Sequence, residues 1–127
     1  MRLLLVVEDD YDIRTALASL LSDLGYSVCD AGDGVKALEK VRSLRPDLIV
    51  LDYGLPGPKD GEEFLRAKAA DRQIGDIPVI VVSGYELPPE IDGTVAVLRK
   101  PFDFSLLAAL IERVVGPPAS PGTNAAA

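Results

Sequence analysis

The sequence predicts an α/β fold in which a doubly wound parallel sheet carries helices on both faces. Two observations predict it. Short apolar runs alternate along the chain with segments whose apolar residues recur at helical spacing, which is the pattern of successive βαβ units. Most of the runs are nearly free of polar residues, as expected for parallel strands that helices cover on both sides.

Five apolar runs predict five strands, and turn-forming or capping residues bound them. In chain order the runs are Leu3–Val7, Tyr26–Ala31, Leu48–Leu51, Pro78–Val82 and about Val95–Leu98. The second run is the more polar one, because it contains Ser27 and Asp30. We therefore expect this strand near the edge of the sheet.

Four segments carry apolar residues at helical spacing, and a residue that can cap a helix precedes each of them. These capping residues are, in order, Asp10 or Asp12, Asp33, Asp60, and Asp103 or Ser105. The apolar positions are Ile13, Leu17, Leu20, Leu21 and Leu24; then Val35, Leu38, Val41 and Leu44; then Phe64, Leu65 and Ala69; and finally Leu106, Leu107, Leu110, Ile111 and Val114. Gly25 ends the first helix, and Pro46 follows the end of the second.

The segment between the fourth and fifth strands is too short for a full helix. Only residues 84–94 separate the two strands, and among them are Gly84, Pro88, Pro89 and Gly93. Glycine and proline are unfavourable in a helix interior. We therefore expect a vestigial helix of at most one turn, or a loop, at this place.

Length and composition define the class of protein. A chain of 127 residues with 48% hydrophobic residues is expected to fold as one domain, here residues 1–115. Residues 116–127 have no apolar period and are expected to form a disordered tail. The net charge of −7 argues against a nucleic-acid surface. No apolar run approaches the roughly 20 residues of a membrane span, so we expect a cytoplasmic protein with no membrane partner.

The residue inventory excludes several kinds of chemistry. Histidine is absent, which removes Ser-His-Asp and Cys-His catalysis and histidine-rich metal sites. Cys29 is the only cysteine, so no disulfide can form within the chain.

Polar residues stand where four of the predicted strands end. Glu8 and Asp9 follow the first strand, Asp52 the third, Ser83 ends the fourth and Lys100 follows the fifth. Ligands of open α/β sheets bind at the carboxyl ends of the strands, so we expect these side chains to converge. Three converging carboxylates repel one another unless a cation neutralises them, and oxygen ligands suit Mg²⁺.

Each residue of this group has an expected role. Asp9 and Asp52 are the expected direct ligands of the metal, with the backbone carbonyl of Gly54 as a further one, whereas Glu8 is expected to be more peripheral and to act through water. Asp52 is also the candidate nucleophile, since aspartyl phosphates are known covalent intermediates. Mg²⁺ and Lys100 would stabilise the transferring phosphoryl group, and Ser83 would donate its hydroxyl to it.

At these residues the chain resembles a response-regulator receiver domain of two-component signalling. The resemblance covers residues 2 to about 115 and is carried by VVEDD (6–10), Arg14, LIVLDYGLPG (48–57), Asp60-Gly61, VVSGY (81–85) and LRKPF (98–102). It implies a flavodoxin-like, five-stranded sheet in the order 2-1-3-4-5. It further implies phosphorylation of Asp52 by a histidine kinase or a histidine phosphotransfer protein.

The resemblance also implies roles for individual residues. The metal would lie at Glu8, Asp9, Asp52 and Gly54. Ser83 would act as a switch, Lys100 would form a salt bridge to the phosphoryl group, and the peptide bond before Pro101 would be cis. The position that often holds a switch aromatic is occupied here by Val97.

The expected function is that of a phosphorylated response regulator that signals by protein–protein contact without an attached output domain. It would catalyse only its own phosphoryl transfer and dephosphorylation, and would not be an enzyme otherwise. Two alternatives stay open: a receiver domain taken from a hybrid histidine kinase, and a non-phosphorylated pseudo-receiver that acts as a binding module. An aspartate-nucleophile phosphatase is disfavoured, because Gly54 stands where such an enzyme needs a second acid. The downstream protein and the oligomeric state are left open.

Overall fold

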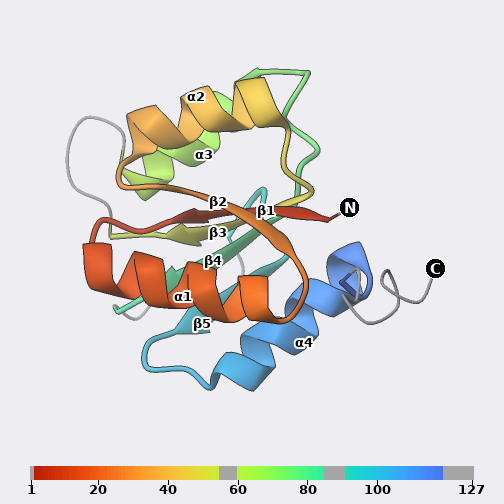
Figure 1. The fold of residues 1–127 in the computed structure, drawn as a ribbon. Coiled ribbons are helices and arrows are strands. Elements are labelled where there is room, and N and C mark those ends of the chain that lie inside the picture. Colours follow the sequence, from red (N-terminus) through yellow and green to blue (C-terminus); the bar gives the residue numbers. More distant parts are fainter. Residues whose placement is uncertain (1, 55–59, 85–90, 119–127) are drawn as a thin grey trace.

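A five-stranded parallel sheet runs through the centre of the molecule (Figure 1). The structure is a computed structural model, and it describes residues 2–54, 60–84 and 91–118. The strands are β1 (Leu3–Val7), β2 (Ser27–Ala31), β3 (Leu48–Asp52), β4 (Val79–Ser83) and β5 (Ala96–Arg99). Their order is β2-β1-β3-β4-β5, which confirms the predicted topology. The more polar strand β2 lies at the edge, as expected.

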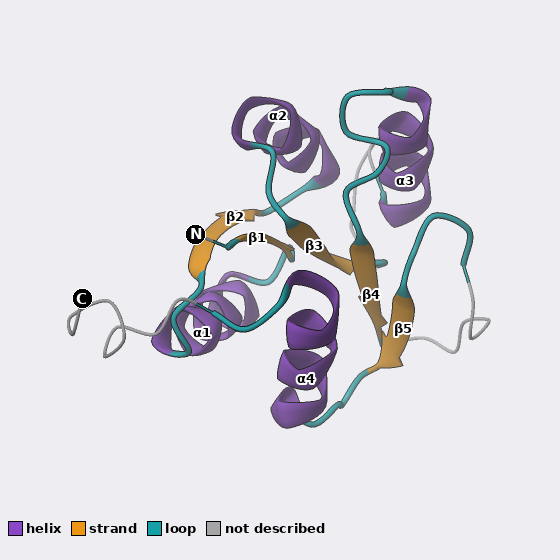
Figure 2. Ribbon diagram, turned by 90° about the vertical axis from the view of Figure 1, so that its right-hand side faces the viewer, coloured by secondary structure: helices purple, strands orange, loops and turns teal. Residues whose placement is uncertain are grey.

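Helices cover both faces of this sheet. They are α1 (Tyr11–Asp23), α2 (Gly34–Leu44), α3 (Gly61–Ala70) and α4 (Phe104–Val115). Helices α1 and α4 lie on one face, and α2 and α3 lie on the other; Figure 2 shows the two helical layers on either side of the strands. The doubly wound α/β architecture is therefore confirmed.

An aspartate caps the first turn of every described helix. Asp10 accepts a hydrogen bond from the Ile13 N–H at 3.0 Å, and Asp103 accepts one from the Ser105 N–H at 2.9 Å. The structure thus chooses Asp10 over Asp12 and Asp103 over Ser105. The two remaining caps are Asp33 and Asp60. These bonds satisfy N–H groups that have no partner within the helix.

Alternate residues of the strands enter two separate cores. Under α2 and α3, the core includes Leu5, Val7, Ile49, Leu51, Val79, Val81 and Phe64. Under α1 and α4, it includes Leu4, Val6, Leu48, Val50, Ile80, Val82, Leu21, Leu107 and Ile111. Strands β3 and β4 are buried along their whole length, which explains why their sequences are unbroken apolar runs.

No helix stands between β4 and β5 among the residues that are described there, 84 and 91–95. The chain turns at Asp92-Gly93, with Gly93 at a φ of 83°, and the Thr94 N–H donates to the Ile91 carbonyl. The residues 85–90 of the predicted loop lie outside the described part, as do residues 119–127 of the predicted tail. Within the described ranges, no helix is long and apolar enough to cross a membrane.

Helix α1 buries less of its apolar face than its sequence suggests. Leu21 is fully buried, whereas the exposed fractions of Ile13 and Leu20 are 47% and 45%. These side chains stay exposed because α1 and the segment that follows β5 do not pack tightly here, and a groove of about 510 Å³ lies between them. Ile13 and Leu20 line this groove and do not enter the core.

Candidate functional site

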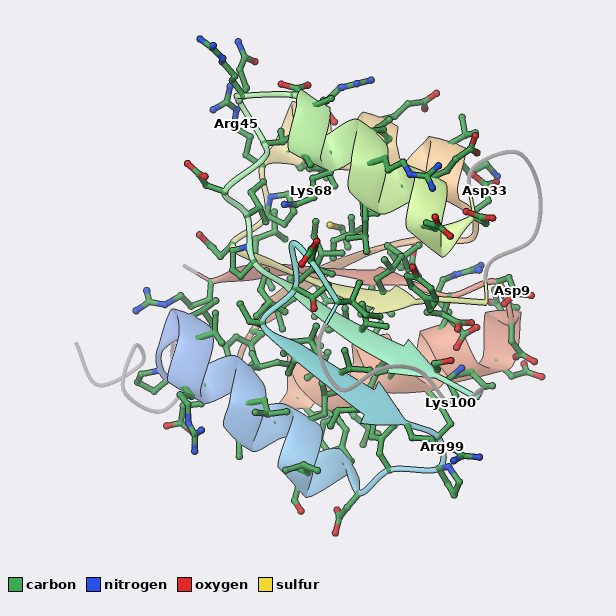
Figure 3. The ribbon with its side chains drawn as sticks, turned by 180° about the vertical axis from the view of Figure 1, so that it is seen from behind. Asp9, Asp33, Arg45, Lys68, Arg99 and Lys100 are labelled. Carbon is green, nitrogen blue, oxygen red and sulfur yellow. The ribbon has the colours of Figure 1, made fainter. Side chains whose placement is uncertain are left out.

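The predicted acidic residues meet at the carboxyl ends of β1 and β3. These strands pair in parallel with Val7 opposite Leu51, so Glu8 and Asp52 occupy neighbouring positions at the edge. One carboxylate oxygen from each of Glu8, Asp9 and Asp52 lies within 4.8 Å of the others. In Figure 3, Asp9 and Lys100 are seen at the same end of the sheet, and Arg45 lies at the opposite end.

Lys100 brings its ammonium group to this cluster. Its Nζ lies 2.8 Å from Glu8 Oε1 and 3.6 Å from Asp52 Oδ2. The backbone positions the residue: the Lys100 N–H donates to the Ser83 carbonyl at 2.7 Å, which continues the pairing of β5 with β4. The Lys100–Pro101 peptide bond is cis, as the resemblance implies.

Glu8 is not peripheral, and this part of the sequence analysis was wrong. Its residue is only 4% exposed, whereas Asp9 is exposed. Both residues follow the end of β1, and the carboxylate of Asp9 reaches the shared cluster from the exposed side of the site, whereas that of Glu8 reaches it from the interior. Glu8 is held inward by Lys100 at 2.8 Å, and its carboxylate also accepts from the Asp10 N–H at 3.4 Å.

The cluster carries more negative charge than one ammonium can balance. The pKa of Glu8 is raised from 4.5 to about 7: burial is the largest cause, nearby Asp52 adds to the increase, and the hydrogen bond from Lys100 acts against it. Burial by itself would lower the pKa of Lys100, but Glu8 and Asp52 outweigh it and raise that pKa above its ordinary value. A hard divalent cation with oxygen ligands would relieve the same repulsion, so these residues fit Mg²⁺.

Gly54 and Ser83 complete the rim of the site. The Gly54 N–H donates to Asp52 Oδ1 at 3.1 Å, a local turn that orients the carboxylate. Ser83 is 1% exposed and follows Val82, the residue of β4 that pairs with Asp52. The structure therefore brings four of the predicted side chains together directly, those of Glu8, Asp9, Asp52 and Lys100. Gly54 lies two positions after Asp52, and Ser83 lies at the end of the neighbouring strand β4.

Arg14 is a member of the site region to which the sequence analysis gave no role. Its Nη1 donates to the main-chain carbonyl of Glu8 at 2.8 Å, and its Nε lies 3.6 Å from Asp30 Oδ2 at the end of β2. One signal was available in the sequence. A positive side chain near the N-terminus of a helix interacts unfavourably with the helix dipole. An arginine at this position therefore indicates that its guanidinium binds a group outside the helix.

The groove beside α1 opens onto the same cluster. It is lined by Glu8, Val82, Lys100, Pro101 and Phe102, together with the side of α1 formed by Ile13, Ala16, Leu17 and Leu20, and by Phe104. A mainly apolar surface therefore borders the charged site, at the place from which a second protein could reach it.

This fold and this group of residues define a signalling receiver, and comparison with known families agrees. The family described as "response regulator receiver domain" matches residues 4–112. The chain therefore belongs to the response regulator receiver domain family.

Individual relatives differ in length. The protein Rrf1 of Nitratidesulfovibrio vulgaris is 35% identical to the chain, and the match covers 97% of this chain and 93% of Rrf1. The nitrogen assimilation regulatory protein NtrX of Azorhizobium caulinodans is 34% identical over 88% of this chain, which spans only 26% of that longer protein.

A solved structure gives the same fold. The receiver domain of the sensor histidine kinase PA1611 from Pseudomonas aeruginosa PAO1 has a TM-score of 0.81 and 28% identity, with 91% of this chain and 98% of that chain covered. That domain was solved with a magnesium ion coordinated in its active-site cleft.

Proposed function

We propose that this protein is a phosphoacceptor in two-component signalling or in a phosphorelay, with Asp52 as the residue that takes the phosphoryl group. The observation that carries the proposal is the placement of Lys100 Nζ within 3.6 Å of Asp52 Oδ2, inside the cluster formed with Glu8 and Asp9. An isolated carboxylate would repel a phosphate. Here the ammonium group of Lys100 lies next to the carboxylate of Asp52, where it offsets that repulsion.

Mg²⁺ bound at Glu8, Asp9 and Asp52, with the backbone of Gly54 beside them, would offset the negative charge that Asp52 and the phosphoryl group share. The protein's own groups do the remaining work. The Gly54 N–H holds Asp52 Oδ1 and so leaves Oδ2, which faces Lys100, as the attacking oxygen. Lys100 would exchange its contact with Asp52 for one with the transferred group.

The phosphoryl donor would be a histidine kinase or a histidine phosphotransfer protein, because a phosphohistidine can transfer its group to a carboxylate. The donor would occupy the groove beside α1, since that groove shares Glu8 and Lys100 with the site. Leu20→Glu would place a charge in the groove. It should slow transfer from a phosphorylated phosphotransfer domain and leave labelling by acetyl phosphate unchanged; equal slowing of both reactions would contradict this role of the groove.

The chemistry is limited to phosphoryl transfer onto Asp52 and its later hydrolysis, and the output is a contact with another protein. A stand-alone regulator and a receiver within a hybrid kinase would use the same site. The cytoplasmic location stays a prediction. The pseudo-receiver alternative differs in one measurable respect, because it would not accept a phosphoryl group.

The test is the intact mass of the protein after incubation with acetyl phosphate and Mg²⁺. We expect a gain of one phosphoryl group that disappears in Asp52→Asn and in the presence of a chelator. Asp92→Asn, which changes an exposed aspartate in a turn, is the matched control and should be labelled like the wild type. Labelling that persists in Asp52→Asn, or no labelling by any donor of a folded protein that binds Mg²⁺, would refute the proposal.

A further inference from the structure

We propose that Arg14 is a positioning residue for the metal: it fixes the peptide between Glu8 and Asp9, and thereby holds the acidic cluster in the arrangement that binds Mg²⁺. This inference rests on the proposed function, because it presupposes that the cluster binds Mg²⁺. It adds a residue on α1 that touches neither the metal ligands' carboxylates nor the phosphoryl site.

The peptide groups on both sides of Glu8 are held by hydrogen bonds. The Glu8 N–H donates to the Ala31 carbonyl at 3.1 Å, which continues the pairing of β1 with β2. The Glu8 carbonyl accepts from Arg14 Nη1 at 2.8 Å. This carbonyl belongs to the peptide that leads into Asp9, and peptide groups are planar. Arg14 therefore sets the plane from which the Asp9 side chain departs.

Arg14 is itself held in place. Its side chain is only 17% exposed, its Nε lies 3.6 Å from Asp30 Oδ2, and its guanidinium lies 5.5 Å from the centre of the Tyr11 ring. A guanidinium presents several donors in one rigid plane, so it can contact the Glu8 carbonyl and Asp30 at once. Asp30 stands on β2, so Arg14 joins the acidic loop to the edge of the sheet.

Gly32 provides the space for this arrangement. A Cβ at position 32 would lie 2.8 Å from Arg14 Nη1, the atom that donates to Glu8, and no backbone atom is among its three nearest neighbours. Gly32→Ala would therefore displace the guanidinium and leave its charge and the main chain in place. Its effect on Mg²⁺ binding would therefore report the position of the Arg14 guanidinium alone, because the charge of the site is unchanged.

The sign of the effect distinguishes positioning from simple electrostatics. A fixed positive charge near a metal site repels Mg²⁺, so removing Arg14 would strengthen Mg²⁺ binding if charge alone mattered. If Arg14 acts by holding the loop, removing it weakens binding. Substitution of outer groups that orient metal ligands typically lowers metal affinity about 10–100-fold.

The experiment measures the stability of each variant against urea at increasing Mg²⁺ concentration, with the same variant in a chelator as its own reference. Because a ligand that binds only the folded state stabilises it by RT ln(1 + [Mg²⁺]/Kd), the increase in stability over the chelator reference gives the Kd for Mg²⁺ independently of any loss of stability in the metal-free protein. The variants are Arg14→Ala, Gly32→Ala and the double substitution. Arg42→Ala is the matched control, because Arg42 pairs with Asp71 at 3.1 Å on another part of the surface.

We expect Arg14→Ala to raise the Kd about tenfold or more and Gly32→Ala to raise it in the same direction. The double variant should bind no more weakly than Arg14→Ala, since both changes remove one contact, and Arg42→Ala should match the wild type. An unchanged or lower Kd in Arg14→Ala, or additive losses in the double variant, would overturn the inference. If Arg14→Ala fails to fold, a wild-type Kd in Gly32→Ala would overturn it. A wild type that binds no Mg²⁺ would instead refute the metal site of the proposed function.

Discussion

Glu8→Gln should make the metal-free protein more stable at alkaline pH, although it removes a charge from the acidic site. Burial against Asp52 raises the pKa of Glu8 from 4.5 to about 7. Glutamine has a similar shape, and its amide oxygen can still accept from Lys100, which donates to Glu8 Oε1 at 2.8 Å. Its amide nitrogen cannot accept, so the longer contact of the Asp10 N–H with Glu8 Oε2 at 3.4 Å is lost. The substitution therefore removes the ionisation of Glu8 and keeps its shorter hydrogen bond.

The magnitude follows from the shift in pKa. Because the pKa of Glu8 is higher in the folded state than in the unfolded state, its contribution to stability is fully present below pH 4.5 and is lost as the pH rises through about 7. One pKa unit corresponds to about 1.36 kcal/mol, so the shift amounts to about 3 kcal/mol. Glu8 is 4% exposed, so solvent screens little of this effect.

The assay is urea unfolding of the wild type and of Glu8→Gln between pH 4.5 and 8.5, in the presence of a chelator. We expect equal stability near pH 4.5 and an advantage of the variant that grows to about 3 kcal/mol above pH 7. Glu39→Gln, at an exposed position of α2, is the control and should show no such growth. A difference that does not change with pH, or a wild type that is more stable at pH 8, would refute the reasoning.

Three further predictions concern the site and its support. Lys100→Ala should still be phosphorylated, more slowly, but the shifts of amide resonances away from the site should no longer follow; unchanged shifts would place the switch elsewhere. Gly61→Ala should lower the free energy of unfolding by about 1–3 kcal/mol, because a Cβ at position 61 would lie 2.8 Å from the Tyr53 carbonyl oxygen. Gly84→Ala is the control: a Cβ at position 84 would have no neighbouring atom within 4 Å, so this free energy should change by no more than about 0.5 kcal/mol. Phe64→Ala removes a fully buried ring and should lower the free energy of unfolding by about 3–5 kcal/mol in urea titrations. A loss below about 1.5 kcal/mol would show that the core collapses into the space left by the ring.

The electrostatics of the site connect two of these measurements. Glu8 and Asp52 share the ammonium of Lys100, at 2.8 Å and 3.6 Å. Without the ammonium, the pKa of Glu8 should rise further, so Lys100→Ala should move the pH dependence of stability to higher pH. Mg²⁺ should act in the opposite direction, because it favours the ionised carboxylates.

Local signals in the sequence were sufficient for the elements and their order. The apolar runs became strands because a buried parallel strand has no polar face, and the aspartates became caps because their side chains reach N–H groups two or three residues along the chain. The alternation of strands and helices then left a doubly wound sheet as the natural topology. The ends of the strands followed, and with them the convergence of Asp9, Asp52 and Lys100.

Only the tertiary structure decided how the converging residues share the site. The burial of Glu8 depends on Lys100, which is 92 positions away in the chain, and the place of Arg14 depends on Asp30 and on the missing side chain of Gly32. The exposure of Leu20 likewise depends on a groove between α1 and the segment after β5. A capping bond is fixed by neighbours along the chain, whereas burial and charge pairing are fixed by whichever elements pack together, and a local sequence pattern carries no record of those neighbours.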